Sequence, residues 1–358
     1  MGLASLDLVD FRSFTTAHFA PDPEGTTVLL APNGTGKTSL LEAVGYLGTG
    51  RSFRGAAREV MIRNGADDAI VRATVRADGA EVLIEAQLSR NGRSRIQVNR
   101  QAAKTRKDLA DAVAVTSFAP EDVTVVRGGP AGRRDVLDDA LSLLDSTAGA
   151  LLEDVARVLR QRGALLRQVR GRLDDAAAAT LDVWDERLGV LGDDLARRRT
   201  ALTESLAPVI GETYRVLSAD DATVEATYVP SWAGDLGDAL AAARGDDVRR
   251  GVSTTGPHRD DVSLQIAGRD TRTQASQGEQ RSLALSIRIA VHQRVTAARR
   301  RPPLLLLDDV FSELDAGRAA RLLELLPIGQ ALLTTAVPPP PGLSTADVID
   351  VEKLHGGA

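Results

Sequence analysis

The first hundred residues alternate between short apolar runs and polar turns. Apolar residues at positions 3, 6, 8 and 9 and the run at 26–30 predict two short strands, with a turn at 21–25 between them. Alternation resumes over residues 69–99 and is interrupted at Asp78-Gly79 and Asn91-Gly92, dipeptides that are typical of hairpins. We therefore expect the strands within residues 69–99 to pair with one another as an antiparallel β meander.

The pattern becomes helical after about residue 135. Apolar residues from Leu152 to Leu173 recur at steps of three, four or seven, and those from Leu181 to Leu202 repeat the pattern. Each segment of about 22 residues would form a helix about 33 Å long. We expect an antiparallel helical hairpin standing off a globular head, with a compact helical bundle as the alternative. Residues 230–250 show no regular pattern, and strand-like alternation returns at 262–266.

Composition narrows the class of protein. A chain of 358 residues favours two or three units. No apolar stretch reaches the roughly 18 residues of a membrane span, and the first residues lack the pattern of a secretory leader. The chain has no cysteine, which excludes disulfides, thiolate metal sites and cysteine nucleophiles. We expect a cytoplasmic protein without a membrane partner.

The net charge of −5 is not that of a general nucleic-acid binder, so any DNA contact depends on local patches. Of the 44 basic residues only four are lysines. Arginines cluster at residues 51–63, 90–107, 157–172, 197–199 and 299–301. Such runs form either solvated faces or phosphate-binding patches, and charge alone leaves both interpretations open.

A phosphate-binding loop follows the strand at 26–30. It fits the pattern G-x-x-x-x-G-K-[ST] except at its first position, and its residues are Ala31, Pro32, Asn33, Gly34, Thr35, Gly36, Lys37 and Thr38. The two glycines let backbone N–H groups point at phosphate oxygens. Lys37 would reach the β- and γ-phosphates of ATP, and Thr38 would bind Mg²⁺. We expect Ala31 to be tolerated because its position needs no positive φ.

The run Leu304–Leu307 predicts a buried strand that ends in two acids. Asp308 would hold Mg²⁺, and Asp309 would polarise the attacking water as a general base. A core strand that ends in a solvated turn is the plainer alternative. About 270 residues separate this strand from the phosphate loop, so a further segment, the helical one, is inserted between them.

Ser276 and Glu279 form a capping-box pattern at the start of a predicted helix. The pattern marks either a helix start without a ligand or a helix end that binds phosphate. In ATPases of the ABC type such a segment meets the γ-phosphate held by the partner subunit, and we expect that arrangement here. Its residues are Ser276, Gln277, Gly278, Glu279 and Gln280.

Together these motifs resemble the RecF family, which is related to SMC and Rad50 head domains. The resemblance runs along nearly the whole chain and is carried by residues 10–14, 49–54, 118–134, 181–185 and 255–261, besides the motifs above. It implies an ABC-type ATPase head with an α/β fold. The head would contain a mixed sheet with a phosphate-loop core and an antiparallel β meander, and it would carry an inserted, coiled-coil-like helical arm. The expected limits are 1–134 and 251–358 for the head and 135–250 for the arm.

The resemblance also implies a function. A RecF-type protein would form an ATP-dependent homodimer, bind DNA at gaps or duplex/single-strand junctions and help RecO and RecR load RecA. It would hydrolyse ATP slowly, stimulated by DNA, and would be associated with the nucleoid. Arg12 would lie near the adenine and ribose, and Ser312 and Asp315 would form a D-loop that crosses the dimer interface.

The chain departs from ABC-type patterns at three places. Ala31 replaces a glycine, Glu121 stands where a Q-loop glutamine is expected, and Thr334 stands near the position of a switch histidine. His258, one of four histidines, is as well explained by a turn as by catalysis. The alternatives are an SMC-like or other ABC-type head with a different partner, a transporter subunit, and a scaffold that binds ATP without hydrolysing it.

Overall fold

The computed structural model describes residues 2–77, 79–299, 301–326, 329–338, 343 and 347–354. The chain divides into two compact units. The first comprises Met1–Val123, Thr213–Asp220 and Ser282–Ala358, and the second comprises Thr124–Glu212 and Asp221–Arg281. Among the described residues, no helix has both the length and the apolar character needed to cross a membrane. The limits expected from the sequence at 134/135 and 250/251 stay a prediction.

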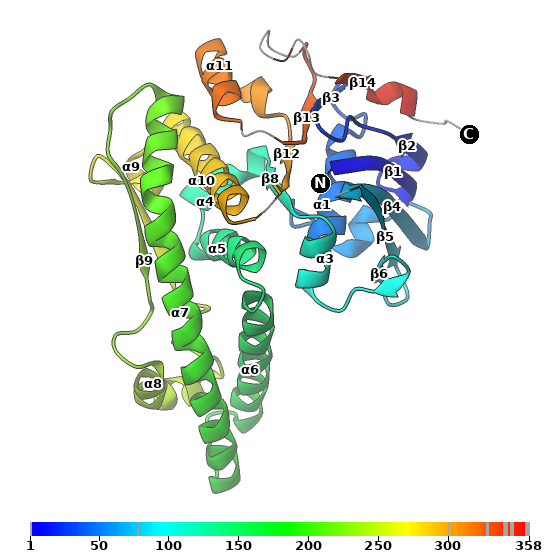
Figure 1. Cartoon of the computed structure of the whole chain (residues 1–358). Coiled ribbons are helices and arrows are strands. Elements are labelled where there is room, and N and C mark those ends of the chain that lie inside the picture. Colours follow the sequence, from blue (N-terminus) through cyan, green and yellow to red (C-terminus); the bar gives the residue numbers. More distant parts are fainter. Residues whose placement is uncertain are drawn as a thin grey trace. The chain divides into compact units, whose positions relative to one another are not determined.

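The first unit contains a five-stranded sheet in which all paired strands run parallel, in the order β14-β3-β13-β12-β8 (Figure 1). Its strands are β3 (Thr26–Leu30), β8 (Val115–Phe118), β12 (Leu304–Leu307), β13 (Ala331–Thr335) and β14 (Asp347–Asp350). The strands predicted at 26–30 and before Asp308 are thus confirmed. Because parallel strands end at one edge of a sheet, the segments after β3 and β12 lie close together.

A second sheet of the same unit has six antiparallel strands in the order β2-β1-β4-β5-β6-β7. They are β1 (Gly2–Phe11), β2 (Phe14–Phe19), β4 (Asp68–Ala77), β5 (Ala80–Ser89), β6 (Arg95–Val98) and β7 (Gln101–Ala102). The predicted meander is confirmed. Gly79 turns the β4–β5 hairpin with φ of 78°, while its neighbour Asp78 lies outside the described residues.

Helix α1 (Lys37–Thr49) packs against both sheets. Leu40 and Leu41 are fully buried, and their hydrophobic cluster includes Leu306 of the parallel sheet and Val71 of the antiparallel one. Apolar contact on both sides fixes the helix, and with it the loop at its N-terminus. The other short elements are α2 (Arg58–Met61), α3 (Arg106–Ala112), η1 (Pro120–Asp122), η2 (Val310–Glu313), α11 (Ala316–Leu325) and η4 (Val351–Leu354).

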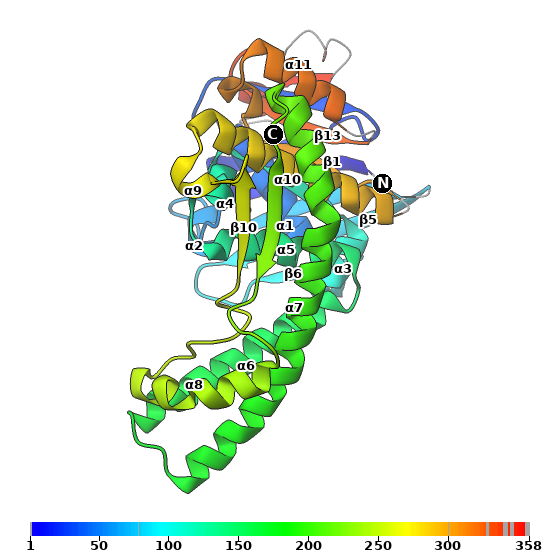
Figure 2. The same ribbon diagram turned by 90° about the vertical axis from the view of Figure 1, so that its left-hand side faces the viewer.

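The second unit is mainly helical. It holds α5 (Pro130–Leu144), α6 (Ala148–Val169), α8 (Leu236–Arg250), α9 (Thr271–Gln274) and a sheet of β9 (Val224–Val229), β10 (Asp261–Ile266) and β11 (Arg269–Asp270). Three helices cross the unit limits: α4 (Val123–Arg127), α7 (Asp175–Ser218) and α10 (Gln277–Ala298). Both views show α6 and α7 side by side (Figures 1 and 2). The two predicted helical segments are therefore confirmed as neighbours.

Two details of the sequence analysis are wrong. Helix α7 has 44 residues, twice the predicted length, and extends beyond the predicted segment at both ends. Pro208 does not end it, because this residue lies on the exposed side of the helix, where water can replace the lost hydrogen bond. Residues 236–250 form a helix instead of an irregular segment. Leu236 and Leu240 anchor α8 and Asp235 caps it, but its alanine- and glycine-rich middle carries no apolar period.

Candidate nucleotide-binding site

The loop between β3 and α1 has the backbone that phosphate binding needs. Gly34 and Gly36 have φ of 86° and 97°, a region that favours glycine. A Cβ on Gly36 would lie 2.8 Å from the Phe14 ring and the Ser13 hydroxyl, so no larger residue fits. Ala31 is not among the residues of positive φ, which confirms that the first position of the loop tolerates alanine.

Lys37 is held inside the loop. Its Nζ donates to the carbonyl oxygens of Ala31 and Pro32 at 2.5 and 2.8 Å, and to Oδ1 of Asn33 at 3.4 Å. Burial lowers the pKa of Lys37, and the nearby charges of Asp309 and Asp308 act against this shift. The ammonium group is therefore oriented by three acceptors that phosphate oxygens can replace.

Asp308 joins the phosphate loop to the parallel sheet. Its Oδ1 accepts hydrogen bonds from the hydroxyl of Thr38 at 2.8 Å and from that of Thr334, in β13, at 2.7 Å. Burial raises the pKa of Asp308, although both hydroxyl groups favour its charged form. A hydroxyl and a carboxylate at this distance, on two different elements, form the protein's half of a Mg²⁺ site.

Asp309 follows with a strained backbone and an unpaired oxygen. Its φ is 46°, in the left-handed region. Its N–H donates to the Thr334 hydroxyl at 2.8 Å, and its side chain lines the cavity beside Lys37. Within the described chain the buried Oδ1 atom of Asp309 has no hydrogen-bond partner. A carboxylate oxygen without a hydrogen-bond partner, on a residue that lines a cavity, can accept a hydrogen bond from a bound water.

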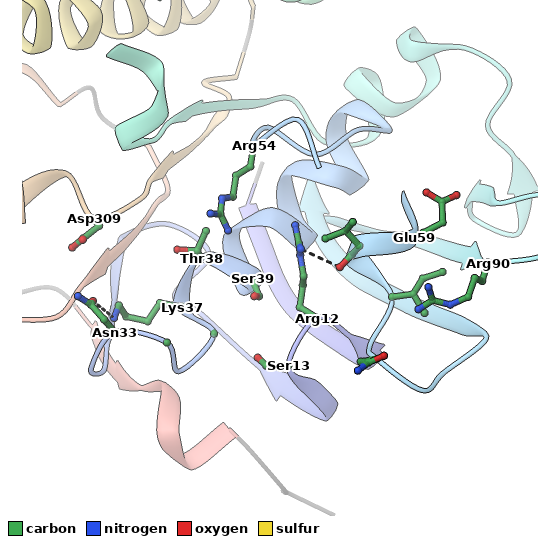
Figure 3. A pocket seen from close by; sticks show the side chains of 15 residues that line it. Arg12, Ser13, Asn33, Lys37, Thr38, Ser39, Arg54, Glu59, Arg90 and Asp309 are labelled. Carbon is green, nitrogen blue, oxygen red and sulfur yellow. Dashed lines mark hydrogen bonds between the residues drawn. The ribbon is translucent and has the colours of Figure 1, made fainter. Parts of the chain in front are cut away.

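These residues surround a cavity of about 760 Å³, within the size range of small-molecule sites (Figure 3). Lys37 and Asn33 lie toward one end of it and Glu59 and Arg90 toward the other (Figure 3). Its lining residues are Arg12, Ser13, Asn33, Gly34, Gly36, Lys37, Thr38, Ser39, Arg54, Glu59, Val60, Ile62, Asn64, Arg90 and Asp309. The sequence analysis missed Asn64 and Arg90, for which the arginine clusters at 51–63 and 90–107 were the only signal.

Arg12 is fixed in this lining by a buried carboxylate of α1. Its Nε and Nη2 atoms each donate to Glu42 at 2.6 Å, and Nη1 donates to the Val60 carbonyl at 3.0 Å. Ser52 adds a 2.5 Å hydrogen bond to Glu42, whose side chain is fully buried. Three of the five guanidinium donors are thus occupied before any ligand binds, so Arg12 is held in one orientation.

The remaining predicted site residues are arranged as follows. In the second unit, Ser276 and Glu279 form the expected capping box, with bonds of 2.6 and 3.2 Å, and the buried Gln280 side chain donates to the Thr271 carbonyl at 2.9 Å. In the first unit, Ser312 donates to the Asp309 carbonyl at 2.8 Å and Asp315 caps α11. Ser312, Asp315 and Glu121 do not line the cavity, and Glu121 pairs at 3.4 Å with Arg54, which does line it.

Residues 255–261 form hydrogen bonds and an ion pair within the second unit. Asp260 is fully buried and accepts hydrogen bonds from the Tyr228 hydroxyl and, at 2.8 Å, from the Ser231 N–H. Asp261 forms a bidentate pair with Arg133 at 2.7 and 3.0 Å. Burial lowers the pKa of His258, whose Nε2 contacts the Ser253 carbonyl at 3.1 Å. These contacts support a structural role for residues 255–261.

The cavity fits a magnesium nucleotide. An anionic phosphate can bind to the backbone N–H groups of the phosphate loop, to the Lys37 ammonium group and to the Arg12 guanidinium group. The unpaired Oδ1 of Asp309 can accept a hydrogen bond from a water molecule. The described residues contain no cluster of three or more His, Cys, Asp or Glu side chains that could hold a metal alone. Thr38 and Asp308 would supply two ligands to Mg²⁺, which typically keeps several waters and phosphate oxygens in its shell.

Known proteins resemble this chain along nearly its whole length. The family described as RecF/RecN/SMC N terminal domain matches residues 2–332. The DNA replication and repair protein RecF of Frankia alni is 38% identical over an alignment of 356 positions that covers 94% of each chain. The chain belongs to the RecF family. RecF of Streptomyces avermitilis is 37% identical over 352 residues, covering 94% of this chain and 93% of that protein.

Solved RecF structures share the fold. The recombination mediator protein RecF with ATP has a TM-score of 0.87 at 28% identity and covers 94% of this chain and 92% of that one. RecF-ATPrS has a TM-score of 0.85 at 26% identity, covering 98% and 96%. An Smc head bound to the C-winged helix domain of ScpA reaches 0.54 at 17% identity, over 94% and 90% of the two chains, and shows the fold alone. The predicted ABC-type ATPase head with a helical arm is confirmed.

Proposed function

We propose that this chain is an ATP-dependent DNA-binding protein of recombinational repair and replication. It dimerises when ATP binds, engages DNA at gaps or duplex/single-strand junctions and assists RecO and RecR in loading RecA. ATP hydrolysis is slow, is stimulated by DNA and releases the dimer. This activity places the protein at the nucleoid. The head residues 1–134 and 251–358 carry the nucleotide, and residues 135–250 form the arm.

The observation that carries the proposal is that Lys37, Thr38 and Asp309 line one cavity at the edge of the parallel sheet, with Asp308 hydrogen-bonded to the Thr38 hydroxyl at 2.8 Å. Bound MgATP would supply the γ-phosphoryl group and the charge that attracts a partner subunit. Lys37 would exchange its carbonyl partners for phosphate oxygens, and Thr38 and Asp308 would hold the metal. Oδ1 of Asp309 would orient the attacking water and accept its proton.

The proposed dimer rests on residues 276–280 of the second unit. This segment has the helix start and exposed serine suited to bind a phosphate. We assign Ser276 and Gly278, with their neighbours Gln277, Glu279 and Gln280, to the γ-phosphate of the partner's nucleotide. Ser312 and Asp315 would cross the same interface. Two such composite sites generate a two-fold dimer that ATP stabilises by its higher affinity for the closed state.

Two variants test this assignment. Lys37→Met should abolish both ATP binding and ATP-induced dimers in light scattering. Ser276→Arg should preserve ATP binding, measured by a fluorescent analogue, yet block the dimer. Normal ATP-dependent dimers of the Ser276 variant would contradict the assignment in trans.

The DNA function needs a separate test. Gel shift on gapped and on blunt duplex DNA, with and without ATP, should show ATP-dependent preference for the gapped substrate. Phosphate release, measured with Mg²⁺ and with or without DNA, should show hydrolysis that DNA accelerates. Indifference to DNA in every nucleotide state would favour an ABC head with another partner, and a lack of phosphate release would favour a scaffold.

A further inference from the structure

The exposed face of α6 carries arginine and glutamine side chains. The buried residues of the helix include Leu151, Val155, Val158, Arg162 and Leu166. At about 100° per residue these lie on one side. The opposite side, here called the α6 stripe, has eight exposed residues with a single acid near its start: Ala150, Glu153, Arg157, Arg160, Gln161, Ala164, Arg167 and Gln168. Arg170 and Arg172, both exposed, follow directly at the end of the helix.

Most of this positive charge is not neutralised by the protein. Arg157 pairs with Asp154 at 2.9 Å. Within the described ranges, however, no ion pair involves the four other arginines of this region, which are Arg160, Arg167, Arg170 and Arg172. Elsewhere in the same unit, the exposed Arg197 and Arg249 are paired, with Asp194 and Asp246. The unpaired guanidinium groups give this surface a local excess of positive charge, which favours contact with an anionic ligand.

We propose that the α6 stripe, together with Arg170 and Arg172, binds the sugar-phosphate backbone of DNA. This inference rests on the proposed DNA-binding function and assigns a surface to it. Arginine and glutamine are donors to phosphate oxygens, and such contacts require no particular base sequence. Arg160 and Arg167 are two helical turns apart, about 10 Å along the axis, so they can contact different phosphates of one strand.

The composition of the stripe favours nucleic acid over an acidic protein segment. Its residues besides arginine are Ala150, Glu153, Gln161, Ala164 and Gln168, none of them aromatic or large and apolar. Protein interfaces take most of their binding energy from such anchors, especially Trp and Tyr, in their buried centre. A surface of arginine and glutamine donors without an apolar centre is typical of proteins that contact the sugar-phosphate backbone of nucleic acids.

The test compares two double variants of the full-length protein. Arg160→Ala/Arg167→Ala removes two unpaired cations and keeps the helix, because alanine is a good helix former. Arg197→Ala/Arg249→Ala is the matched control, since it removes two exposed arginines of the same unit that are already paired. Affinity for a fluorescent gapped duplex is measured by anisotropy with a non-hydrolysable ATP analogue, at several salt concentrations.

The first variant should bind DNA about tenfold more weakly, and the slope of log K against log salt should fall by about two. The control should stay within about twofold of the wild type. Hydrolysis of ATP without DNA should be unchanged in both variants, because none of the four residues lines the cavity.

The outcomes separate this inference from the function on which it rests. If the wild type binds no DNA in any nucleotide state, the proposed function fails. If the wild type binds DNA and the Arg160/Arg167 variant keeps both its affinity and its salt slope, DNA binding stands and the assignment to α6 is overturned. The assignment is equally overturned if that variant loses only the binding of an acidic protein such as a mediator partner.

Discussion

Thr334 donates a hydrogen bond to Oδ1 of Asp308 at 2.7 Å, and the same hydroxyl oxygen accepts one from the N–H of Asp309 at 2.8 Å. One fully buried side chain on β13 therefore connects both acids that end β12. The parallel register pairs Leu307 with Leu333, which brings Thr334 level with Asp308. In the proposed mechanism this hydroxyl sets where the metal ligand and the general base lie relative to each other.

Replacing Thr334 by valine should slow hydrolysis more than it weakens ATP binding. The variant keeps the shape of the side chain but loses the bonds to both acids, so we expect kcat to fall about tenfold, as for other residues that orient a metal ligand. The KM for ATP should change less than threefold. Thr334→Ser retains the hydroxyl and should recover most of the rate.

Thr335→Val is the matched control for this prediction. Thr335 is also buried on β13, but its hydroxyl donates to the Val337 carbonyl at 2.9 Å. Unfolding in urea gives the stability of each variant and separates misfolding from a slower reaction. If the Thr334 and Thr335 valine variants lose the same fraction of activity, Thr334 does not position the acids.

Glu42→Gln should weaken nucleotide binding by releasing Arg12. Glu42 accepts two hydrogen bonds from Arg12 at 2.6 Å, and a neutral amide cannot accept this bidentate, charge-assisted pair. Loss of a supporting partner of this kind commonly lowers affinity by about 10- to 100-fold. Isothermal titration with ATP would measure it, and kcat at saturating ATP should fall less.

Glu59→Gln serves as the comparison, because Glu59 also lines the cavity but pairs with Arg58 at the surface, at 3.0 Å. It should bind ATP within about threefold of the wild type. Equal affinities of the Glu42 variant and the wild type would show that Arg12 does not depend on Glu42 for nucleotide binding.

The sequence predicted the parts of this site that are local in the chain. The phosphate loop could be identified because its glycines, lysine and threonine lie within eight positions, between a strand and a helix. Thr334 and Glu42 could not be assigned a partner, because Thr334 reaches Asp308 only through strand pairing, and Glu42 reaches Arg12 only through the packing of α1 on the antiparallel sheet. The length of α7 was missed for a similar reason, since the exposure of Pro208 depends on the fold.

Arg162→Met should strongly destabilise the second unit. Arg162 is fully buried and bonds Asp185 at 2.6 Å, Asp247 at 2.7 Å and Ser253 at 2.8 Å. Removing the cation leaves the buried Asp247 without its counter-charge, although Asp185 keeps its pair with Arg244 at 2.8 Å, so we expect a loss of about 3–5 kcal/mol in the free energy of unfolding. Urea titration followed by far-UV circular dichroism measures it.

Arg157→Met is the control on the same helix, because Arg157 lies on the exposed face and its change should stay within about 0.5 kcal/mol. A stability of the Arg162 variant equal to that of the control would mean that the buried ion pairs contribute no net stabilisation.

His292 should make the first unit less stable as the pH falls below neutrality. Burial lowers the pKa of His292 to about 4, and its Nδ1 contacts the Thr116 hydroxyl at 2.5 Å. In the unfolded chain the pKa returns to about 6.5, so between these values the unfolded state binds the extra proton and folding stability rises with pH. The neutral His292→Gln variant lacks this proton. From pH 7 to pH 5 the wild type should lose about 2 kcal/mol more than the variant, and the carboxylates common to both cancel in the difference. Parallel urea titrations at the two pH values measure this difference. An equal loss in both proteins would mean that His292 is already protonated, or accessible to solvent, in the folded state.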